Sequence, residues 1–283
     1  MKKLSTLTLI LIFTIAFFTG CKKNIGDPPV LPPIETMKID FSNFTSGNKS
    51  AEITEIESAL KGVESGNYQY ASAVAGFWNL LLTLNLAIPV TSFSESFNHT
   101  PTYIDNKTWQ WAYSVNALAG TYKARLTGQI RASDIKWEMH LTKEGIGAFS
   151  EFLWFEGTSA LNGNSGQWIL YHSATFPEQM LQIDWTIENE IVGNIKYTYV
   201  RVKKDDRTID TSNGSYIVYG LQNSSLNAFY NVHIYESFLA HSFVDVFIEW
   251  STANNNGHVK AFYKYTDNNW HCWNSNGNDI VCN

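Results

Sequence analysis

Hydrophobic and polar positions follow two different periods along this chain, and the change lies near residue 106. Before it, apolar residues recur every three or four positions between Ile53 and Val63, and again in the stretch YQYASAVAGFWNLLLTLNLAIPV. This spacing places apolar side chains on one face of a helix. We therefore expect helical structure over residues 50–97: a helix capped by Ser50, a longer apolar helix packed against protein, and a further turn or short helix from Pro89 to Phe97.

From Thr108 onward, apolar and polar residues alternate. In TYKARLTGQI and in IKWEMHLT, apolar side chains are separated by polar or charged ones. A period of two is typical of a strand with one buried and one solvent-facing side, which favours an antiparallel sheet. The same alternation recurs, between turn signals such as Asn213-Gly214, in the segments 181–187, 195–202, 216–221, 229–235, 243–250 and 258–265.

About eleven such strands are too many for a flat open sheet, so we expect the sheet to curve into a half-barrel or to close into a barrel. Because the helices precede the strands, the sequence predicts an α+β fold that is mainly β, with N-terminal helices packed on the antiparallel sheet. This outline resembles the curved half-barrel of periplasmic lipoprotein-carrier proteins and, less closely, a lipocalin barrel. The chain carries no motif diagnostic of either family, so the resemblance is restricted to the fold.

The N-terminus, MKKLSTLTLILIFTIAFFTGCKKN, combines two lysines, an apolar run from Leu7 to Phe18 and small residues before Cys21. The apolar run is shorter than the about 20 residues that a membrane-spanning helix requires. A charged start followed by a short apolar stretch indicates a secretory signal. Here the chain resembles the bacterial lipoprotein family, whose lipobox ends in Gly-Cys, although Phe18 stands where that family usually has Leu.

The resemblance implies that residues 1–20 are a signal peptide and that Cys21 carries a thioether-linked diacylglycerol and an acylated amine. Two or more acyl chains anchor a protein stably, so it further implies the bacterial cell envelope, most often the outer membrane, with the periplasmic or surface side left open. Residues 21–40, which contain four closely spaced prolines, are expected to form the lipidated start and an extended tether. Residues 41–283 are expected to form a single globular domain. An ordinary signal peptide with an incidental cysteine is the alternative.

Two further cysteines, Cys272 and Cys282, lie near the C-terminus. An oxidising compartment favours a disulfide between them, and an odd hairpin loop centred on Gly277 would place Cys272 directly opposite Cys282. A zinc site is a weaker alternative, because His271 would project to the other strand face. A redox pair lacks the Cys-x-x-Cys spacing, and two free thiols are the remaining alternative.

Charge bears on the class of partner. The chain has 20 basic and 26 acidic residues and a net charge of −6, and loss of Lys2 and Lys3 with the signal peptide would leave 18 basic residues and a net charge of −8. No basic stripe runs along the sequence, so we expect no nucleic-acid partner. The expected partner is the membrane, through the N-terminal lipid anchor.

Sequence motifs of catalysis and of cofactor binding are missing: there is no Gly-x-Ser-x-Gly elbow, no phosphate loop, no dinucleotide fingerprint and no His-Glu-x-x-His. We therefore expect no catalytic residues, no cofactor and no metal site. Glu138, Asp184 and Glu249 each adjoin a strand tryptophan, and a pair of such acids could serve glycoside hydrolysis. Strand alternation explains them more simply as solvent-facing residues, and it explains His140 and His233 in the same way.

Ten tryptophans in 283 residues indicate broad, half-buried sheet surfaces. If the helices leave part of the curved sheet uncovered, some tryptophans would line a groove for an apolar or glycan ligand; otherwise they fill the core. The candidates are Trp109, Trp111, Trp137, Trp185 and Trp250. The sequence therefore predicts a non-catalytic binding or assembly protein with a lipid, glycan or protein ligand. A glycan-directed envelope hydrolase is the alternative.

Overall fold

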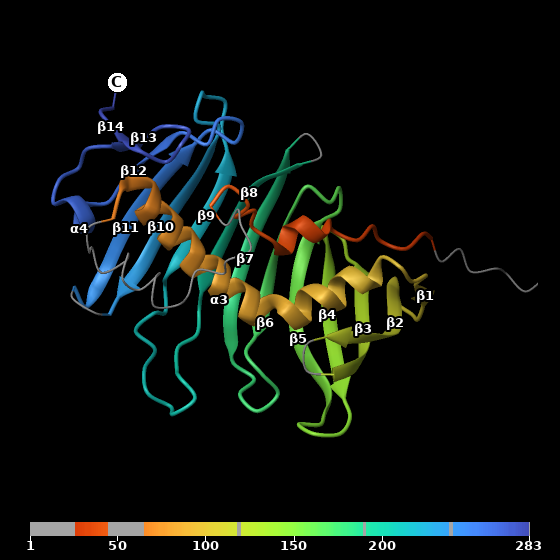
Figure 1. The fold of residues 1–283 in the computed structure, drawn as a ribbon. Coiled ribbons are helices and arrows are strands. Elements are labelled where there is room, and N and C mark those ends of the chain that lie inside the picture. Colours follow the sequence, from red (N-terminus) through yellow and green to blue (C-terminus); the bar gives the residue numbers. More distant parts are fainter. Residues whose placement is uncertain (1–25, 45–64, 118–119, 189–190, 238–239, 283) are drawn as a thin grey trace, which may run out of the picture.

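The computed structural model describes the chain except residues 1–25, 45–64, 118–119, 189–190, 238–239 and 283 (Figure 1). In the described part, fourteen antiparallel strands form one sheet, and each strand pairs with the next along the chain. The strands are β1 (Thr102–Tyr103), β2 (Thr108–Ala117), β3 (Gly120–Ile130), β4 (Asp134–Lys143), β5 (Phe149–Ala160), β6 (Ser165–Tyr171), β7 (Gln179–Glu188), β8 (Ile191–Tyr199), β9 (Tyr216–Leu221), β10 (Ala228–Glu236), β11 (Ser242–Trp250), β12 (Gly257–Lys260), β13 (His271–Trp273) and β14 (Asp279–Ile280). The helical elements are η1 (Ile34–Met37), α3 (Asn67–Ser96) and α4 (Phe262–Tyr265).

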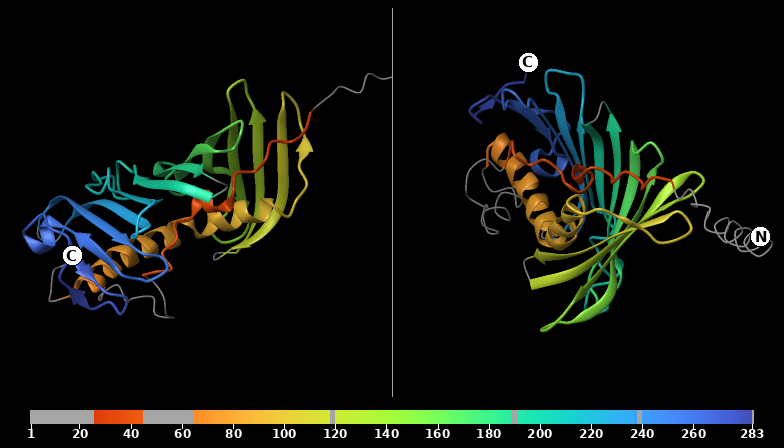
Figure 2. Two further views of the ribbon diagram at one scale, coloured as in Figure 1. Left: turned by 90° about the horizontal axis from the view of Figure 1, so that it is seen from above. Right: turned by 90° about the vertical axis from the view of Figure 1, so that its right-hand side faces the viewer.

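The sheet confirms the mainly β, α+β fold and its curvature, and it does not close into a barrel (Figure 2). More strands are present than the about eleven that the sequence predicts, and β1, with two residues, is too short to show alternation. β13 and β14 form the hairpin expected around the two cysteines. The prediction of a strand over residues 258–265 is confirmed in its first half and wrong in its second. β12 ends at Lys260, and the next residues form the short helix α4.

Both edges of the sheet are short, since β1 and β14 have two residues each. Such edges offer little unpaired backbone to another chain. Between them, α3 lies across the concave face of the sheet (Figures 1 and 2). A helix with its side chains is about 10–12 Å in diameter, so α3 fills much of the space inside the curve.

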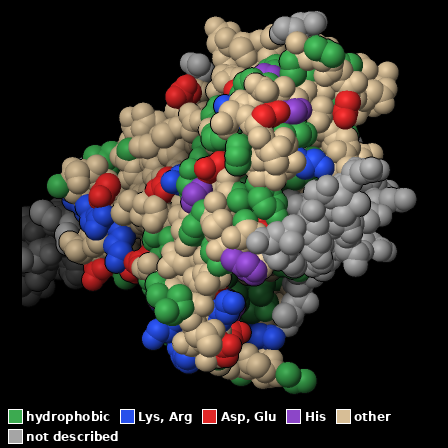
Figure 3. Space-filling view, turned by 90° about the vertical axis from the view of Figure 1, so that its left-hand side faces the viewer, with side chains coloured by type: hydrophobic (Ala, Val, Ile, Leu, Met, Phe, Trp, Pro, Cys, Tyr) green, Lys and Arg blue, Asp and Glu red, His purple; other side chains and the backbone are tan. Residues whose placement is uncertain are grey.

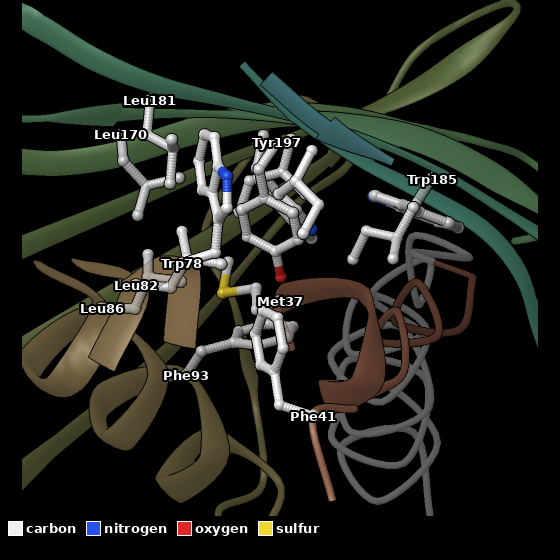
Figure 4. Packing of buried hydrophobic residues seen from close by; sticks show 14 of the residues in the cluster. Met37, Phe41, Trp78, Leu82, Leu86, Phe93, Leu170, Leu181, Trp185 and Tyr197 are labelled. Carbon is white, nitrogen blue, oxygen red and sulfur yellow. The ribbon is translucent and has the colours of Figure 1, made fainter. Parts of the chain in front are cut away.

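α3 buries one side against the sheet, toward which Leu82, Leu86 and Phe93 point (Figure 4). The helix continues through Pro89 to Ser96, so the expected interruption at that proline is wrong. A proline inside a helix costs about 3 kcal/mol. Pro89 itself is buried, and the apolar surface buried around it offsets that cost. The helix expected after Ser50 lies outside the described residues.

Apolar side chains also lie on the side of α3 that faces away from the sheet, where Leu84 is 68 % exposed. Among the described residues, α3 is the one helix whose length and composition would allow it to cross a membrane, a test that the core helix of a soluble protein passes equally. A helix with apolar residues on more than one side does not reveal its buried face clearly in its sequence.

Part of the expected tether belongs to the folded body. η1 contacts α3, β7 and β8, and Met37 is fully buried. The indole N–H of Trp168 donates a hydrogen bond of 3.1 Å to the Thr36 hydroxyl oxygen. Residues 29–40 therefore lie against the folded body, held there by apolar contacts, and residues 21–25 of the expected tether lie outside the described residues.

Tryptophan and glycine alternate across the concave face. Trp109, Gly128, Trp137, Gly157 and Trp168 stand opposite one another on successive strands from β2 to β6. A Cβ atom at Gly128 would lie 2.6 Å from the Trp137 ring, and one at Gly157 would lie 2.4 Å from the Trp168 ring. Each of these two indoles thus occupies the space above a strand position that has no side chain.

Replacement of Gly128 by alanine should lower the free energy of unfolding by about 1–3 kcal/mol, because the added methyl group overpacks the Trp137 ring. In a Trp137→Leu background, which removes the ring, the same replacement should cost measurably less. Denaturant unfolding of the four proteins in this cycle gives the coupling between the two sites. Equal losses in both backgrounds would show that the indole is not what excludes a side chain.

The C-terminal hairpin holds the start of α3. The Asp279 carboxylate accepts a hydrogen bond of 2.7 Å from the backbone N–H of Asn67, and the carbonyl of Cys272 accepts one of 2.9 Å from the Asn67 side chain. A carboxylate at a helix N-terminus satisfies a free N–H group and is favoured by the helix dipole. The hairpin therefore fixes one end of α3 over the sheet.

Cys272 and Cys282 lie at disulfide-bonding distance, with Cα atoms 5.3 Å apart. The expected register is wrong, because Cys272 pairs with Ile280 rather than with Cys282. The turn is centred on Asn276 rather than on Gly277, and a hydrogen bond of 2.9 Å from the N–H of Asn274 to the carbonyl of Asn278 closes it. Cys282 lies two residues beyond Ile280, the residue that pairs with Cys272. Because side chains alternate between the faces of a strand, a step of two residues keeps both cysteines on one face of the hairpin.

Asp279→Ala should lower the free energy of unfolding by about 1 kcal/mol, because it removes the acceptor for the first N–H group of α3. Asp279→Asn keeps an oxygen acceptor and should lose less. Urea unfolding followed by far-ultraviolet circular dichroism measures both variants against the wild type. An Asp279→Ala protein as stable as the wild type would contradict a fixing role for this hairpin.

Candidate functional site

A cavity of 360 Å³ lies between α3 and the concave face of the sheet. Small-molecule sites in proteins have volumes of roughly 300–1,000 Å³. The walls are mostly apolar and come from α3 on one side and from β7, β10 and β11 on the other: Val74, Phe77, Trp78, Leu81, Met180, Ile234, Val244 and Val246. A cavity of this composition suits an apolar or amphiphilic molecule, since removal of apolar surface from water drives such binding.

The polar residues that border the cavity come mainly from the segments that follow β6 and β8. Arg201, which is 7 % exposed, borders it together with His172 and Tyr199. The Arg201 guanidinium donates a hydrogen bond to Asp205, and Nε2 of His172 lies 3.2 Å from the same carboxylate. The positive charge of Arg201 is therefore already balanced by a carboxylate of the protein.

A second carboxylate is buried behind Tyr199. Asp210 is 6 % exposed and accepts hydrogen bonds of 2.9 Å from the Tyr199 hydroxyl and 3.0 Å from the N–H of Ser212. Burial, together with the hydrogen bond to Asp210, raises the pKa of Tyr199 to about 12. Tyr199 therefore stays protonated near neutral pH and acts there as the donor to Asp210.

The Arg201–Asp205 pair is charged on both sides near neutral pH. Burial opposes the charge of Arg201, but its hydrogen bond to Asp205 and its contacts with Tyr199 outweigh that effect and raise its pKa above the usual range. The same hydrogen bond lowers the pKa of Asp205. A charged, paired arginine that borders an apolar cavity is a candidate binding residue.

Three buried nitrogen atoms of cavity-bordering side chains have no hydrogen-bond partner among the described residues. They are Nε of Arg201, Nε1 of Trp78 and Nδ1 of His172. A buried donor without a partner costs about 1–3 kcal/mol. The arginine and tryptophan nitrogens are donors only, and neither is accessible from the cavity, because both atoms are fully buried.

The five tryptophans expected to line a groove lie in the core. Their exposed fractions range from 0 % to 8 %, for Trp109, Trp111, Trp137, Trp185 and Trp250. The tryptophan of the cavity is Trp78 of α3, whose ring lies between Leu181 and Tyr197 (Figure 4). The difference arises because α3 and residues 29–44 cover the concave face that these side chains share.

The acids considered for hydrolysis are on the convex face. Glu138 pairs with Lys136 at 2.6 Å, and Glu249 lies 3.0 Å from His258. Asp184 accepts hydrogen bonds from two glutamine side chains and borders a separate hollow of 390 Å³ with Trp185 and Lys196. Among the described residues that line the cavity below α3, Glu236 is the one carboxylate. A two-carboxylate mechanism requires both acids to face one ligand, and this cavity does not provide such a pair.

The two histidines considered in the sequence also lie away from the cavity. His233 lies 2.7 Å from Asp245 and stacks on Phe243 with ring centres 4.6 Å apart. Burial and the charge of Arg125 lower the pKa of His140. No group of three His, Cys, Asp or Glu residues is placed to hold a metal ion in the part of the chain that the structure covers. Cys21 lies outside that part.

Arg201, His172 and Trp78 are not among the residues that the sequence nominates. Arg201 carries a usable signal, because the alternation that places Ile195, Tyr197 and Tyr199 on one face extends to residue 201. An arginine in register with buried residues is unusual and marks a charge on the inner face. His172 and Trp78 carry no comparable signal, since only the tertiary fold brings them together.

Charge does not single out a partner surface at the end of the molecule that carries β10 to β14. On that face, acidic and basic side chains are interspersed with apolar and histidine side chains, and neither sign forms a continuous patch among the coloured residues (Figure 3).

Comparisons of this chain with protein-family models, with curated proteins and with solved structures found no match. Function is therefore inferred from the chain and its cavity alone.

Proposed function

We propose that this protein is a lipid-anchored lipoprotein of the bacterial cell envelope that binds a small lipid, without catalysis, between α3 and the sheet. Cys21 carries the acyl chains, and the membrane is a partner through them. The folded body holds its ligand in the 360 Å³ cavity.

The cavity is the observation that carries this proposal. Small-molecule sites are concave, mostly apolar and bordered by a few polar groups. The space of 360 Å³, which is partly open to solvent, is lined mainly by aliphatic and aromatic side chains and so fits that description. It offers a lipid chain the apolar surface it needs.

The N-terminal segment supports the anchoring part of the proposal. The eight residues from Cys21 to Pro28 can span at most about 30 Å when fully extended, so the body would stay close to the lipid headgroups. Cys272 and Cys282, at disulfide-bonding distance, suit an oxidising compartment outside the cytosol. A short tether beside a bilayer would supply a lipid ligand at high local concentration.

Native mass spectrometry of the protein extracted from membranes should show an adduct with the mass of a small lipid. Leu81→Trp places a larger ring in the cavity and should abolish the adduct, whereas Leu84→Trp, on the exposed side of the same helix, should leave it. Circular dichroism establishes that both variants fold. An adduct that persists in Leu81→Trp, or no adduct in the wild type, would contradict lipid binding in this cavity.

Cys21→Ala should move the protein out of the acylated membrane fraction, because the sulfur that carries the acyl chains is lost. Intact mass of the wild type should exceed that of the unmodified chain from Cys21 onward by the mass of its acyl groups. Cell fractionation followed by intact-mass measurement tests both points. A wild-type protein whose mass matches an unmodified Cys21 would end the lipoprotein assignment and leave the cavity unaffected.

A further inference from the structure

We infer that the ligand of this cavity has a single hydrocarbon chain of about 12 carbons and is not a two-chain membrane lipid. The inference rests on the proposed lipid-binding function and specifies the class of lipid. It follows from the volume of the cavity, from its extent along α3 and from the position of its polar residues.

The volume limits the amount of hydrocarbon that the cavity accepts. A methylene group fills roughly the volume of a water molecule in the liquid, about 30 Å³. The 360 Å³ of the cavity therefore hold about 12 methylene groups. A membrane lipid with two chains of about 14 carbons each would need roughly 840 Å³, more than twice this volume. Such a lipid would leave at least one chain in water, which is unfavourable.

The cavity extends along α3. The residues of this helix that line it recur at helical spacing on one side: Tyr70, Val74, Phe77, Trp78, Leu81 and Asn85. From Tyr70 to Asn85 the helix rises about 22 Å along its axis. A space of 360 Å³ that follows the helix over this length is narrow. It suits one extended chain that lies along α3, and not two chains side by side.

The chain and the head of such a ligand would meet different surroundings. Buried apolar side chains on both walls, among them Val74 of α3 and Val246 of β11, would shield the chain from water. The polar residues His172, Ser212 and Ser237 come from the segments that follow β6, β8 and β10. Because each strand pairs antiparallel with the next, these segments share one edge of the sheet. The head group would therefore lie at that edge.

Two series of single-chain lipids measure the length of chain that the full-length protein accepts. The series are fatty acids and 1-monoacylglycerols, each from octanoyl to octadecanoyl. The protein is kept in a steroid detergent, whose fused rings are wider than one chain, and native mass spectrometry ranks the adducts from an equimolar mixture of each series. Affinity should rise about tenfold for each pair of carbons added. It should stop rising at about 12 carbons, when the cavity is full.

Substitutions in the lining should change the preferred chain length. Leu81→Ala removes most of a side chain from the wall and should lengthen the preferred chain by about two carbons, whereas Val246→Phe adds a ring and should shorten it by about two. Leu84→Ala, on the exposed side of the same helix, is the matched control and should leave the length unchanged. Circular dichroism establishes that each variant folds. The same preferred length in Leu81→Ala and in the wild type would overturn the inference that the chain fills this cavity.

A two-chain lipid with a matched head completes the test. Dioctanoylglycerol carries more carbons than monododecanoylglycerol but divides them between two chains, and it should give the weaker adduct. An equal or stronger adduct from dioctanoylglycerol would overturn the single-chain ligand and leave lipid binding standing. The absence of an adduct from every member of both single-chain series would contradict the proposed function itself.

Discussion

Most indole rings on the concave face of this sheet lie beside a glycine, a residue without a side chain, on a neighbouring strand. Trp137 lies between Gly128 and Gly157, and at the other end of the sheet Gly257 lies between Trp250 and Trp273. A Cβ atom at Gly257 would lie 2.4 Å from the Trp273 ring. Bulky and absent side chains thus alternate from strand to strand, which fills the inner face while glycine permits the backbone to bend. The packing of the inner face at both ends of the sheet, on which α3 lies, depends on this alternation.

Because α3 crosses the concave face of a curved sheet, its contact with the sheet is not uniform along its length. α3 contacts β2 and β3 in one region and β12 and β13 in another, and the C-terminal hairpin holds its first residue through Asp279. The space between α3 and the middle strands of the sheet is filled partly by η1, which contacts β7 and β8. The cavity occupies another part of that space. In this sense the cavity is a product of the architecture, and the polar segments after β6 and β8 supply its chemistry.

The period of two in the sequence predicts the long strands and their faces well, because one residue in two must face the interior. Trp137 is buried and Glu138 is not, as alternation requires. Other features of the fold leave no periodic pattern in the sequence from which they could be predicted. Two-residue strands are too short to show alternation. The helix α3 has apolar residues on more than one side, which hides its buried face and its continuation through Pro89. The turn made by Asn274 sets the hairpin register. Of the site, Arg201 could have been found from its register with Tyr199, whereas Trp78 and His172 meet the cavity only through tertiary packing.

The central claim is that the space between α3 and the sheet is a lipid site, and a crystal structure of the protein purified from membranes tests it most directly. We expect elongated electron density for a lipid chain between α3 and strands β10 and β11. A cavity that is filled by the protein's own side chains, or that holds only ordered water beside Arg201 and Trp78, would contradict the claim.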